Sequence, residues 1–412
     1  MKTTYQTKDI LEYFDISRQT LYNWINSNLI TKPNTDWRGW RIWEEQHINE
    51  ISDIIERNKE KNNEANLNRN TTNKLFHIHN RRYLGSKYKL IPLIKKVIKE
   101  ECEPYTTFAD IFGGTGVVAD AFNAANTKVI VNDILYSNYI SYHTFFSNEP
   151  YDKRKVKNLI IQLNNIRPEN DNYFSINFGD TYFSYKNALK IGEIRETIEQ
   201  WSNNDIINHR EKSILITSLL YAMDKVANTC GHYDAFRKTI DSGATPIKLL
   251  LPSIKDNYNK NNEFYKEDAN LLVRKIKADI IYIDTPYNSR QYSDSYHLLE
   301  NVARWEKPEV IGVARKMVDR SDIKSAYCTK KAPFVFKDLI DNCDCKYIIV
   351  SYNNMAQKGN GRSNAKISDG EIIETLQSKG TVKVFDTDYK YFTTGKSTIE
   401  KHKERLFLCK VN

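Results

Sequence analysis

The chain has 412 residues, with 61 Lys and Arg against 52 Asp and Glu, a formal net charge of +9. This length predicts two or three domains with a sizeable core. The positive charge favours an anionic partner, most often nucleic acid. The longest apolar stretches are of strand length, which argues against a membrane partner, and the first residues lack the apolar core of a signal peptide. The six cysteines are scattered without zinc or redox spacing, so we expect reduced thiols in a cytoplasmic protein.

Residues 1–57 are predicted to form a small helical DNA-binding unit. Thr7–Tyr13 is its first helix, and Ser17 is a suitable N-cap for a second helix with one apolar face. Residues 37–41 combine a glycine turn with aromatic and cationic side chains. The order resembles the N-terminal winged helix-turn-helix of MerR-type regulators. The candidate DNA contacts are Arg18, Thr20, Tyr22, Arg38 and Arg41. A helical interaction domain that does not touch DNA remains the alternative.

Residues 58–79 are predicted to be a linker, because most of them are polar or charged. His77 and His79 lie at its end. Two histidines without further ligands at useful spacing do not indicate a metal site. We therefore predict that the chain uses no metal.

Two glycine-containing segments open the second domain. The first, residues 81–90, precedes an amphipathic helix. In the second, residues 107–122, a short strand meets a glycine turn and then a helix, and glycines let a backbone approach a ligand closely. The next strand ends in Asp133, a carboxylate able to hold ribose hydroxyls. By itself the pattern Gly-x-Gly-x-x-Ala from Gly114 also fits a dinucleotide fingerprint.

Residues 140–262 lack a regular alternation of strands and helices. Two helices are predicted, one over 191–201 and one that starts near residue 218 and breaks at Gly231. The loop that follows is aromatic and basic. Its candidate DNA contacts are His232, Tyr233, Arg237 and Lys238. A loop that only packs this region on the core is the alternative.

Residues 279–283 are an apolar, β-branched run, which predicts a buried strand of a parallel sheet. The strand stops at Asp284-Thr-Pro-Tyr287, because a proline has no N–H to continue the ladder. A carboxylate and an aromatic ring are thereby presented at the sheet edge where open α/β folds bind ligands. These groups suit methyl transfer to an exocyclic amine of a base. Asp284 and the Thr285 carbonyl would each accept an amine proton, and Tyr287 would stack on a base rotated out of the duplex.

The last part of the chain adds strands and basic loops. Residues 346–353 predict a buried strand, and 382–391 with 405–411 predict a closing hairpin. Residues 315–331 are expected to face phosphates. The glycine-rich loop 355–366 is expected to close over DNA.

The motifs from residue 81 onward resemble those of Dam-like adenine-N6 DNA methyltransferases, whose Asp-Pro-Pro-Tyr becomes Asp-Thr-Pro-Tyr here. Residues 288–300 are similar to companion methylases of type IIS restriction systems. The resemblance implies an α/β Rossmann-like methyltransferase domain over residues 80–412, with a target recognition insertion at 140–262. It implies S-adenosylmethionine as cofactor and double-stranded DNA as substrate. The implied catalytic residues are Asp284, Thr285, Pro286 and Tyr287. The implied cofactor-binding residues are Tyr83, Gly85, Lys87, Asp110, Phe112, Gly114, Gly116, Asp133 and Asp268.

Other functions stay open at this point. Transfer to cytosine N4 or to a protein glutamine uses related tetrapeptides that usually begin with Ser or Asn, so Asp284 argues against both. A non-catalytic DNA-binding regulator is the alternative from a different class. A cognate restriction endonuclease is a possible partner, the N-terminal unit could regulate its own operon, and we expect a bacterial, nucleoid-associated protein.

Overall fold

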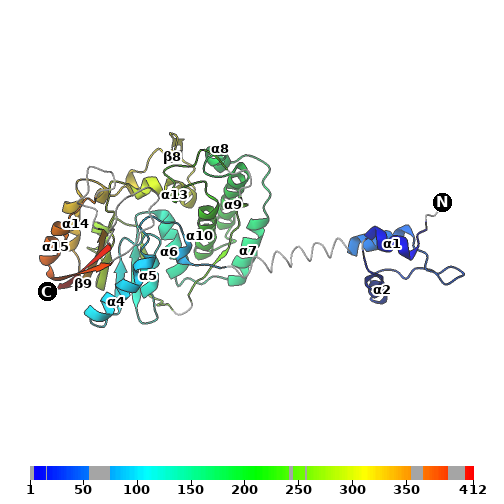
Figure 1. Ribbon diagram of the computed structural model, residues 1–412, viewed down its shortest axis with the longest axis horizontal. Coiled ribbons are helices and arrows are strands. Elements are labelled where there is room, and N and C mark those ends of the chain that lie inside the picture. Colours follow the sequence, from blue (N-terminus) through cyan, green and yellow to red (C-terminus); the bar gives the residue numbers. More distant parts are fainter. Residues whose placement is uncertain are drawn as a thin grey trace. The chain divides into compact units, whose positions relative to one another are not determined.

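The computed structural model describes residues 4–14, 16–54, 75–240, 245–255, 258–353, 365–387 and 404–412. The chain divides into two compact units, Met1–Lys74 and Leu75–Asn412; Figure 1 labels helices and strands of each. The division falls inside the linker predicted over residues 58–79. Most of that linker, and nearly all of the loop predicted at 355–366, lie outside the described residues.

The first unit contains α1 (Thr7–Phe14), α2 (Arg18–Asn26) and a further helical stretch over residues 45–54. Ser17 caps α2, because its side chain accepts a hydrogen bond from the Thr20 N–H, as its position predicted. The apolar faces meet in a small core made of Ile10, Leu21, Ile25, Ile30, Trp43 and Ile51. Between α2 and the last helix, Thr35 and Arg41 form an antiparallel bridge around Gly39. A short folded-back loop therefore stands where the sequence predicted a wing.

The second unit is built on a mixed sheet that has seven strands within the described residues. In spatial order these are β10 (Gly380–Thr387), β11 (Glu404–Val411), β9 (Cys345–Asn353), β6 (Ala278–Ile283), β2 (Thr107–Asp110), β3 (Lys128–Asn132) and β5 (Glu263–Tyr265). β9, β6, β2, β3 and β5 are parallel, and β11 is antiparallel to both β9 and β10. The predicted strand after residue 278 and the closing hairpin are both confirmed.

Helices cover both faces of this sheet, because side chains alternate between the faces along each strand. On β6, Ile280 and Tyr282 belong to an apolar cluster with α4 (Ile91–Glu101) and α5 (Val117–Phe122). Ile281 and Ile283 belong to a second cluster with α11 (Ala269–Leu272), α14 (Ala332–Asp341) and α15 (Asp369–Gln377). The result is a three-layer α/β unit in which β6 is buried on both sides, as its unbroken apolar run predicted.

A third apolar cluster holds together the helical region that the sequence marked as an insertion (Figure 1). The cluster joins α6 (Tyr136–Phe146), α7 (Lys153–Asn165), α8 (Tyr173–Phe178), α9 (Tyr185–Asn203) and α10 (His209–Val226) to α13 (His297–Arg304), which lies outside the predicted insertion. The predicted end of the second helix at Gly231 is wrong, since α10 ends at Val226. α10 begins at His209, nine residues before the predicted start, because Asn208 caps the helix by accepting from the Glu211 N–H.

The remaining short elements connect these layers. They are β1 (Leu75–Phe76), β4 (Leu251–Pro252), α12 (Tyr292–Ser295), β7 (Val310–Ile311) and β8 (Lys316–Met317), together with single 3-10 turns. Among the described residues no helix is long and apolar enough to cross a membrane.

Candidate active site

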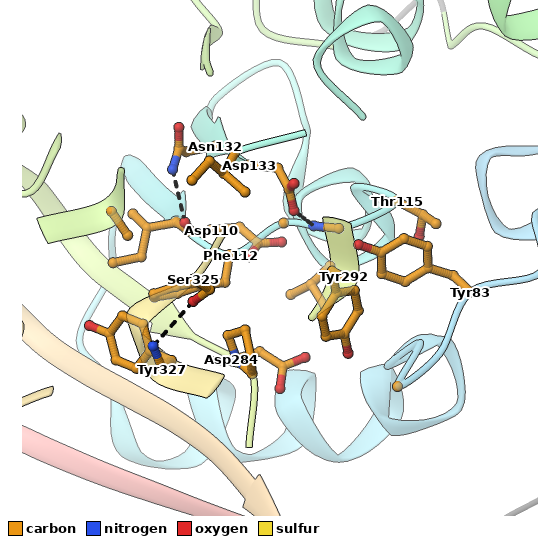
Figure 2. A pocket seen from close by; sticks show the side chains of 18 of the residues that line it. Tyr83, Asp110, Phe112, Thr115, Asn132, Asp133, Asp284, Tyr292, Ser325 and Tyr327 are labelled. Carbon is orange, nitrogen blue, oxygen red and sulfur yellow. Dashed lines mark hydrogen bonds between the residues drawn. The ribbon is translucent and has the colours of Figure 1, made fainter. Parts of the chain in front are cut away.

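The site lies where the connectivity of the sheet reverses. From β2 the chain proceeds to β3 and β5 on one side, whereas from β6 it proceeds to β9 on the other side. Open α/β sheets bind ligands in the crevice at such a point, beyond the carboxyl ends of the strands. Asp110 ends β2 and Asp284 follows β6, and both side chains line one cavity of about 910 Å³, its open mouth included. Figure 2 shows both carboxylates reaching this cavity.

The glycine turn forms the wall of the cavity beside Asp133. Gly114 and Gly116 have φ of +53° and +82°, which residues with a side chain rarely adopt. A Cβ on Gly114 would meet the ring of Tyr83 at 2.9 Å. The Gly114 N–H donates to Oδ2 of Asp133 at 3.0 Å, and the Asp133 Oδ1 accepts from the Leu135 N–H. These bonds fix the turn and the carboxylate together, as a ribose-binding acid requires.

The segment that opens the second domain forms a second wall, which adjoins the glycine turn. Tyr83 stacks on Tyr296 with ring centroids 4.6 Å apart, and Gly85 has φ of +74°. The Nζ of Lys87 lies 2.9 Å from Oδ1 of Asp284, and the lysine side chain is only 5% exposed. Lys87 therefore contacts the predicted catalytic carboxylate directly, which the sequence did not predict.

Carboxyl groups are concentrated around the cavity. Burial, and then the neighbouring Asp284, raise the pKa of Asp110 to about 8. Burial also raises the pKa of Asp133 to about 6, against hydrogen bonds that lower it. Glu267 and Asp268 line the same cavity, and Lys87 is its cation. A positively charged ligand is favoured here, and the pyrophosphate of a dinucleotide is disfavoured, which answers the alternative that the glycine pattern left open.

Aromatic and carboxylate groups meet at the far end of the cavity. Phe112 contacts Tyr327 edge-on, with ring centroids 5.2 Å apart. Asp268 lies beside them on the lining and caps α11 by accepting from the Asn270 and Leu271 N–H groups. Asp268 therefore caps a helix and lines the cavity at the same time.

The tetrapeptide after β6 divides between the cavity and the core. Asp284 and Pro286 line the cavity. Thr285 is 2% exposed, and its Oγ1 is buried without a hydrogen-bond partner in the described part of the chain. Tyr287 is half-buried and packs edge-on against Tyr352, with ring centroids 6.3 Å apart. The Tyr287 carbonyl accepts from the Lys366 N–H, so the loop after the strand is held at its fourth residue.

Comparison with known proteins identifies the family. Residues 83–357 match the model of the D12 class N6 adenine-specific DNA methyltransferases, a span that contains every element of the cavity. The chain belongs to this family. The resemblance drawn from the glycine turn and Asp-Thr-Pro-Tyr is confirmed, and the family uses S-adenosylmethionine as methyl donor.

Individual relatives agree with this assignment. The chain is 40% identical to the modification methylase StsI of Streptococcus sanguinis over 290 residues, which cover 66% of this chain and 44% of that one. It is 32% identical to the type II methyltransferase M.NlaIII of Neisseria lactamica, over 78% of this chain and 95% of that one. The chain spans about half the length of StsI and of the similar methylases LlaI and FokI.

Solved structures overlap only loosely with the chain. Magnesium protoporphyrin IX methyltransferase of Synechocystis, with bound S-adenosylmethionine, gives a TM-score of 0.28 at 9% identity. The overlap covers 78% of this chain and 79% of that one. A match of this size says nothing about individual residues.

The donor that the family implies fits the residues present. The turn at Gly114 and Gly116 has positive φ and close neighbours, so it requires glycines, and the Asp133 carboxyl that it holds lines the cavity. The buried carboxyl groups suit the positive charge of a sulfonium. Each of the nine predicted cofactor residues except Gly116 lines the cavity, and Gly116 shapes the turn.

One predicted DNA contact in the methyltransferase unit is wrong. Tyr233 is 2% exposed, and its hydroxyl donates to Oδ1 of Asp224 at 2.8 Å. Its carbonyl accepts from the hydroxyl of Tyr182 and contacts a ring nitrogen of His297. It is a core residue, because burial needs a polar partner for the hydroxyl and Asp224 supplies it.

The other residues of that loop stay candidates. His232 is half-buried, and Arg237 and Lys238 are exposed. By contrast, two cations expected to face phosphates are paired with carboxylates. Lys316 lies 2.6 Å from Asp234, and Arg320 lies 3.1 Å from Asp294.

Several residues of the cavity gave no signal in the sequence. Tyr292 on α12 donates from its hydroxyl to the Leu84 carbonyl, and Ser325 and Tyr327 come from the segment expected to be a basic loop. Asn132 hydrogen-bonds the Ile111 carbonyl at the base of the glycine turn. Only Asn132 lay in a predicted element, one residue before Asp133, and its polarity inside an apolar strand was the available signal.

Proposed function

We propose that this chain methylates N6 of an adenine within a specific double-stranded DNA sequence, using S-adenosylmethionine. The observation that carries the proposal is that Asp284 and the turn of Gly114 line one cavity at the reversal point of the sheet. Direct methyl transfer needs a binding site for the methyl donor and an acceptor for the amine protons within one cavity. When bound, the donor supplies an activated methyl group on a good leaving group.

The chain's own residues would then act on the amine. The carboxylate of Asp284 accepts one N6 proton by hydrogen bond, and an ionised carboxylate keeps further acceptor capacity beside its Lys87 contact. The Thr285 carbonyl accepts the other proton, and Tyr287 stacks on the flipped base. Together these contacts draw the nitrogen lone pair out of the ring, so positioning supplies most of the catalysis.

The donor would be held by the two walls. Tyr83, Gly85 and the turn of Gly114 line its position, and Asp133 would hold the ribose hydroxyls. Phe112 would stack on the adenine ring of the donor and Asp268 would hydrogen-bond it, since both line the cavity. Asp110 lines the same cavity and would face the sulfonium, and its carboxyl accepts from the Ala119 N–H in the first turn of α5.

Purified chain and labelled methyl donor test this proposal directly. Wild type should transfer label to duplex DNA, and Asp284→Asn should reduce transfer by at least about 100-fold with donor affinity largely kept. Label on cytosine, or equal transfer by the variant, would reject the proposal.

We further propose that the first unit is a winged helix-turn-helix that binds DNA. Arg18 and Thr20 lie at the start of α2, and Arg38 sits between the exposed rings of Trp37 and Trp40. Arg38 also pairs with Asp36 at 3.1 Å, so a phosphate would have to share it. The guanidinium carbon of Arg41 lies 4.4 Å from the centroid of the Tyr22 ring. This pair would therefore stabilise α2 as well as contact DNA.

The biological setting follows from the relatives. They are modification methylases, so we propose that this chain protects a site that a cognate restriction endonuclease cuts, in a bacterial cytoplasm at the nucleoid. The helical region over 140–262 is the proposed target reader. Deleting residues 1–60 should leave site-specific methylation if the first unit is regulatory, and loss of specificity would make that unit part of target reading.

A further inference from the structure

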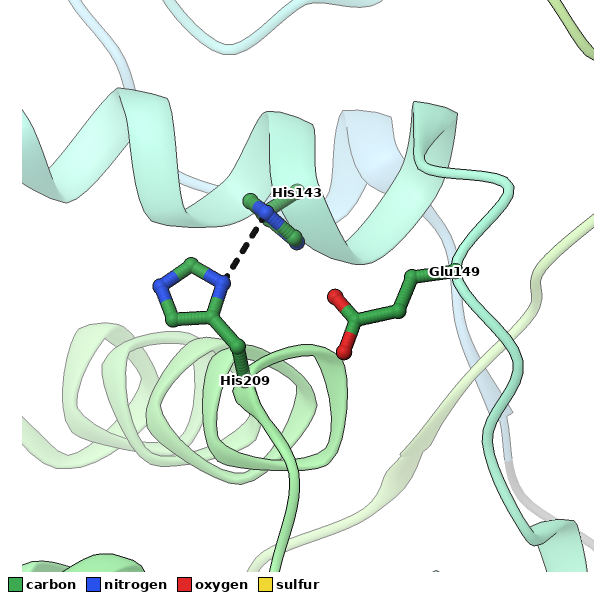
Figure 3. A group of neighbouring side chains, drawn as sticks. All are labelled: His143, Glu149 and His209. Atoms are coloured by element: carbon green, nitrogen blue, oxygen red, sulfur yellow. Dashed lines mark hydrogen bonds between the residues drawn. The ribbon is translucent and has the colours of Figure 1, made fainter.

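A cluster of potential metal ligands lies outside the methyl-transfer cavity. It consists of His143 on α6, Glu149 in the connection to α7, and His209 at the first residue of α10 (Figure 3). One ligand atom from each residue lies within 4.8 Å of the others. It is the one such group among the residues that the structure describes.

The two imidazoles are already close to the spacing of metal ligands. His143 Nε2 and His209 Nδ1 are 3.0 Å apart. In a tetrahedral zinc site with bonds of 2.0–2.1 Å, two nitrogens lie roughly 3.3 Å apart. A shift of a few tenths of an ångström would therefore admit the ion between them.

Within the described residues, the carboxylate of Glu149 is not engaged in a hydrogen bond or an ion pair. Its side chain points toward the two rings in Figure 3. Half-buried carboxylates normally have a partner, so this one is available to a cation.

The backbone behind each ligand is fixed. Glu149 is held on both sides, because its N–H donates to Ser147 Oγ and its carbonyl accepts from the Arg210 guanidinium. His209 starts a helix that Asn208 caps. His143 is 9% exposed and meets the ring of Phe264 at 4.8 Å. Its other ring nitrogen, Nδ1, is buried and has no hydrogen-bond partner in the part of the chain that the structure describes, so Nε2 is the nitrogen that faces the cluster.

We propose that His143, Glu149 and His209 bind one divalent transition-metal ion, for which Zn²⁺ is the best match. Two imidazoles and one carboxylate are a donor set that zinc accepts, with water as a fourth ligand. The ion would tie the connection after α6 to the start of α10. Arg210 opposes a cation at this place, and the charge of Glu149 offsets it, so the site is weaker than a four-ligand one.

Zinc binding to the full chain, stripped with a chelator, tests the site without reference to methylation. Wild type should bind one equivalent in a competition titration with a chromophoric chelator, and Zn²⁺ should raise its unfolding temperature. His209→Ala should weaken binding at least tenfold, and Glu149→Gln should weaken it by less. His209 is exposed, so its replacement disturbs the fold less than replacement of His143 would.

The double variant His77→Ala with His79→Ala is the matched control. These rings also lie close together, with centroids 5.4 Å apart, and they belong to no three-ligand group in the described chain. The control should bind zinc as wild type does. Equal zinc affinity in His209→Ala and wild type, or loss only in the His77 and His79 control, would place the ion elsewhere and overturn the proposal. Absence of a stoichiometric site in wild type would overturn it as well.

Discussion

Replacing Lys87 by Met tests the ion pair at the centre of the cavity. The Lys87 and Asp284 atoms are 2.9 Å apart, and their side chains are 5% and 19% exposed. At an effective dielectric constant of about 20, the attraction at this distance is roughly 6 kcal/mol. Desolvation of both groups cancels much of it, and truncation of one partner of a buried pair typically costs about 3–5 kcal/mol.

Since Asp284 is partly open to solvent, the lower end of that range applies. We expect Lys87→Met to reduce the free energy of unfolding by about 3 kcal/mol, and Lys87→Arg to reduce it much less. Urea unfolding of the donor-free chain measures both values.

A double-mutant cycle decides whether the pair is the cause. If Lys87 acts on Asp284, the loss from Lys87→Met should shrink by about 2 kcal/mol in an Asp284→Asn background. Additive losses of unfolding free energy would show that Lys87 and Asp284 do not interact, which would refute the ion pair between them.

Three further substitutions test other parts of the description. Asp110→Asn should stabilise the donor-free chain more at pH 8 than at pH 5. Burial raises the pKa of Asp110 to about 8, so the stability that its neutral form supplies is lost as pH rises from about 4 through 8. An equal effect at both pH values in urea unfolding would contradict this expectation. Gly114→Ala should weaken donor binding in calorimetry by at least tenfold, since the new methyl group would meet a tyrosine ring at 2.9 Å, while Gly370→Ala, with nothing within 4 Å, should leave it unchanged. Tyr233→Phe should lower the free energy of unfolding by about 1–3 kcal/mol without weakening DNA binding of the folded protein, and weaker DNA binding at unchanged stability would restore Tyr233 as a DNA contact.

The sequence predicted the parts of the fold that depend on local pattern. The strand of Ile280–Ile283 follows from its β-branched run, and the cap at Ser17 follows from its position before an apolar face. Asp284 and Gly114 were expected to share a cavity, since both follow parallel strands, and they do.

Features that depend on tertiary partners were not predictable in this way. Tyr233 reads as an exposed aromatic in a basic loop until Asp224, nine residues earlier, is seen to accept its hydroxyl. Lys87 and Asp284 are far apart in sequence, so no spacing rule joins them. The cavity contribution of Tyr327 arises because the segment after β8 folds back over the sheet edge.

The central claim is that this chain marks adenine, with Asp284 as the acceptor of the amine proton. Sequencing that detects modified bases, applied to DNA from cells expressing the chain, tests it most directly. Wild type should give N6-methyladenine at one recurring sequence, and cells expressing Asp284→Ala should give none. Methylated cytosine, no recurring site, or the same pattern from both chains would contradict the claim.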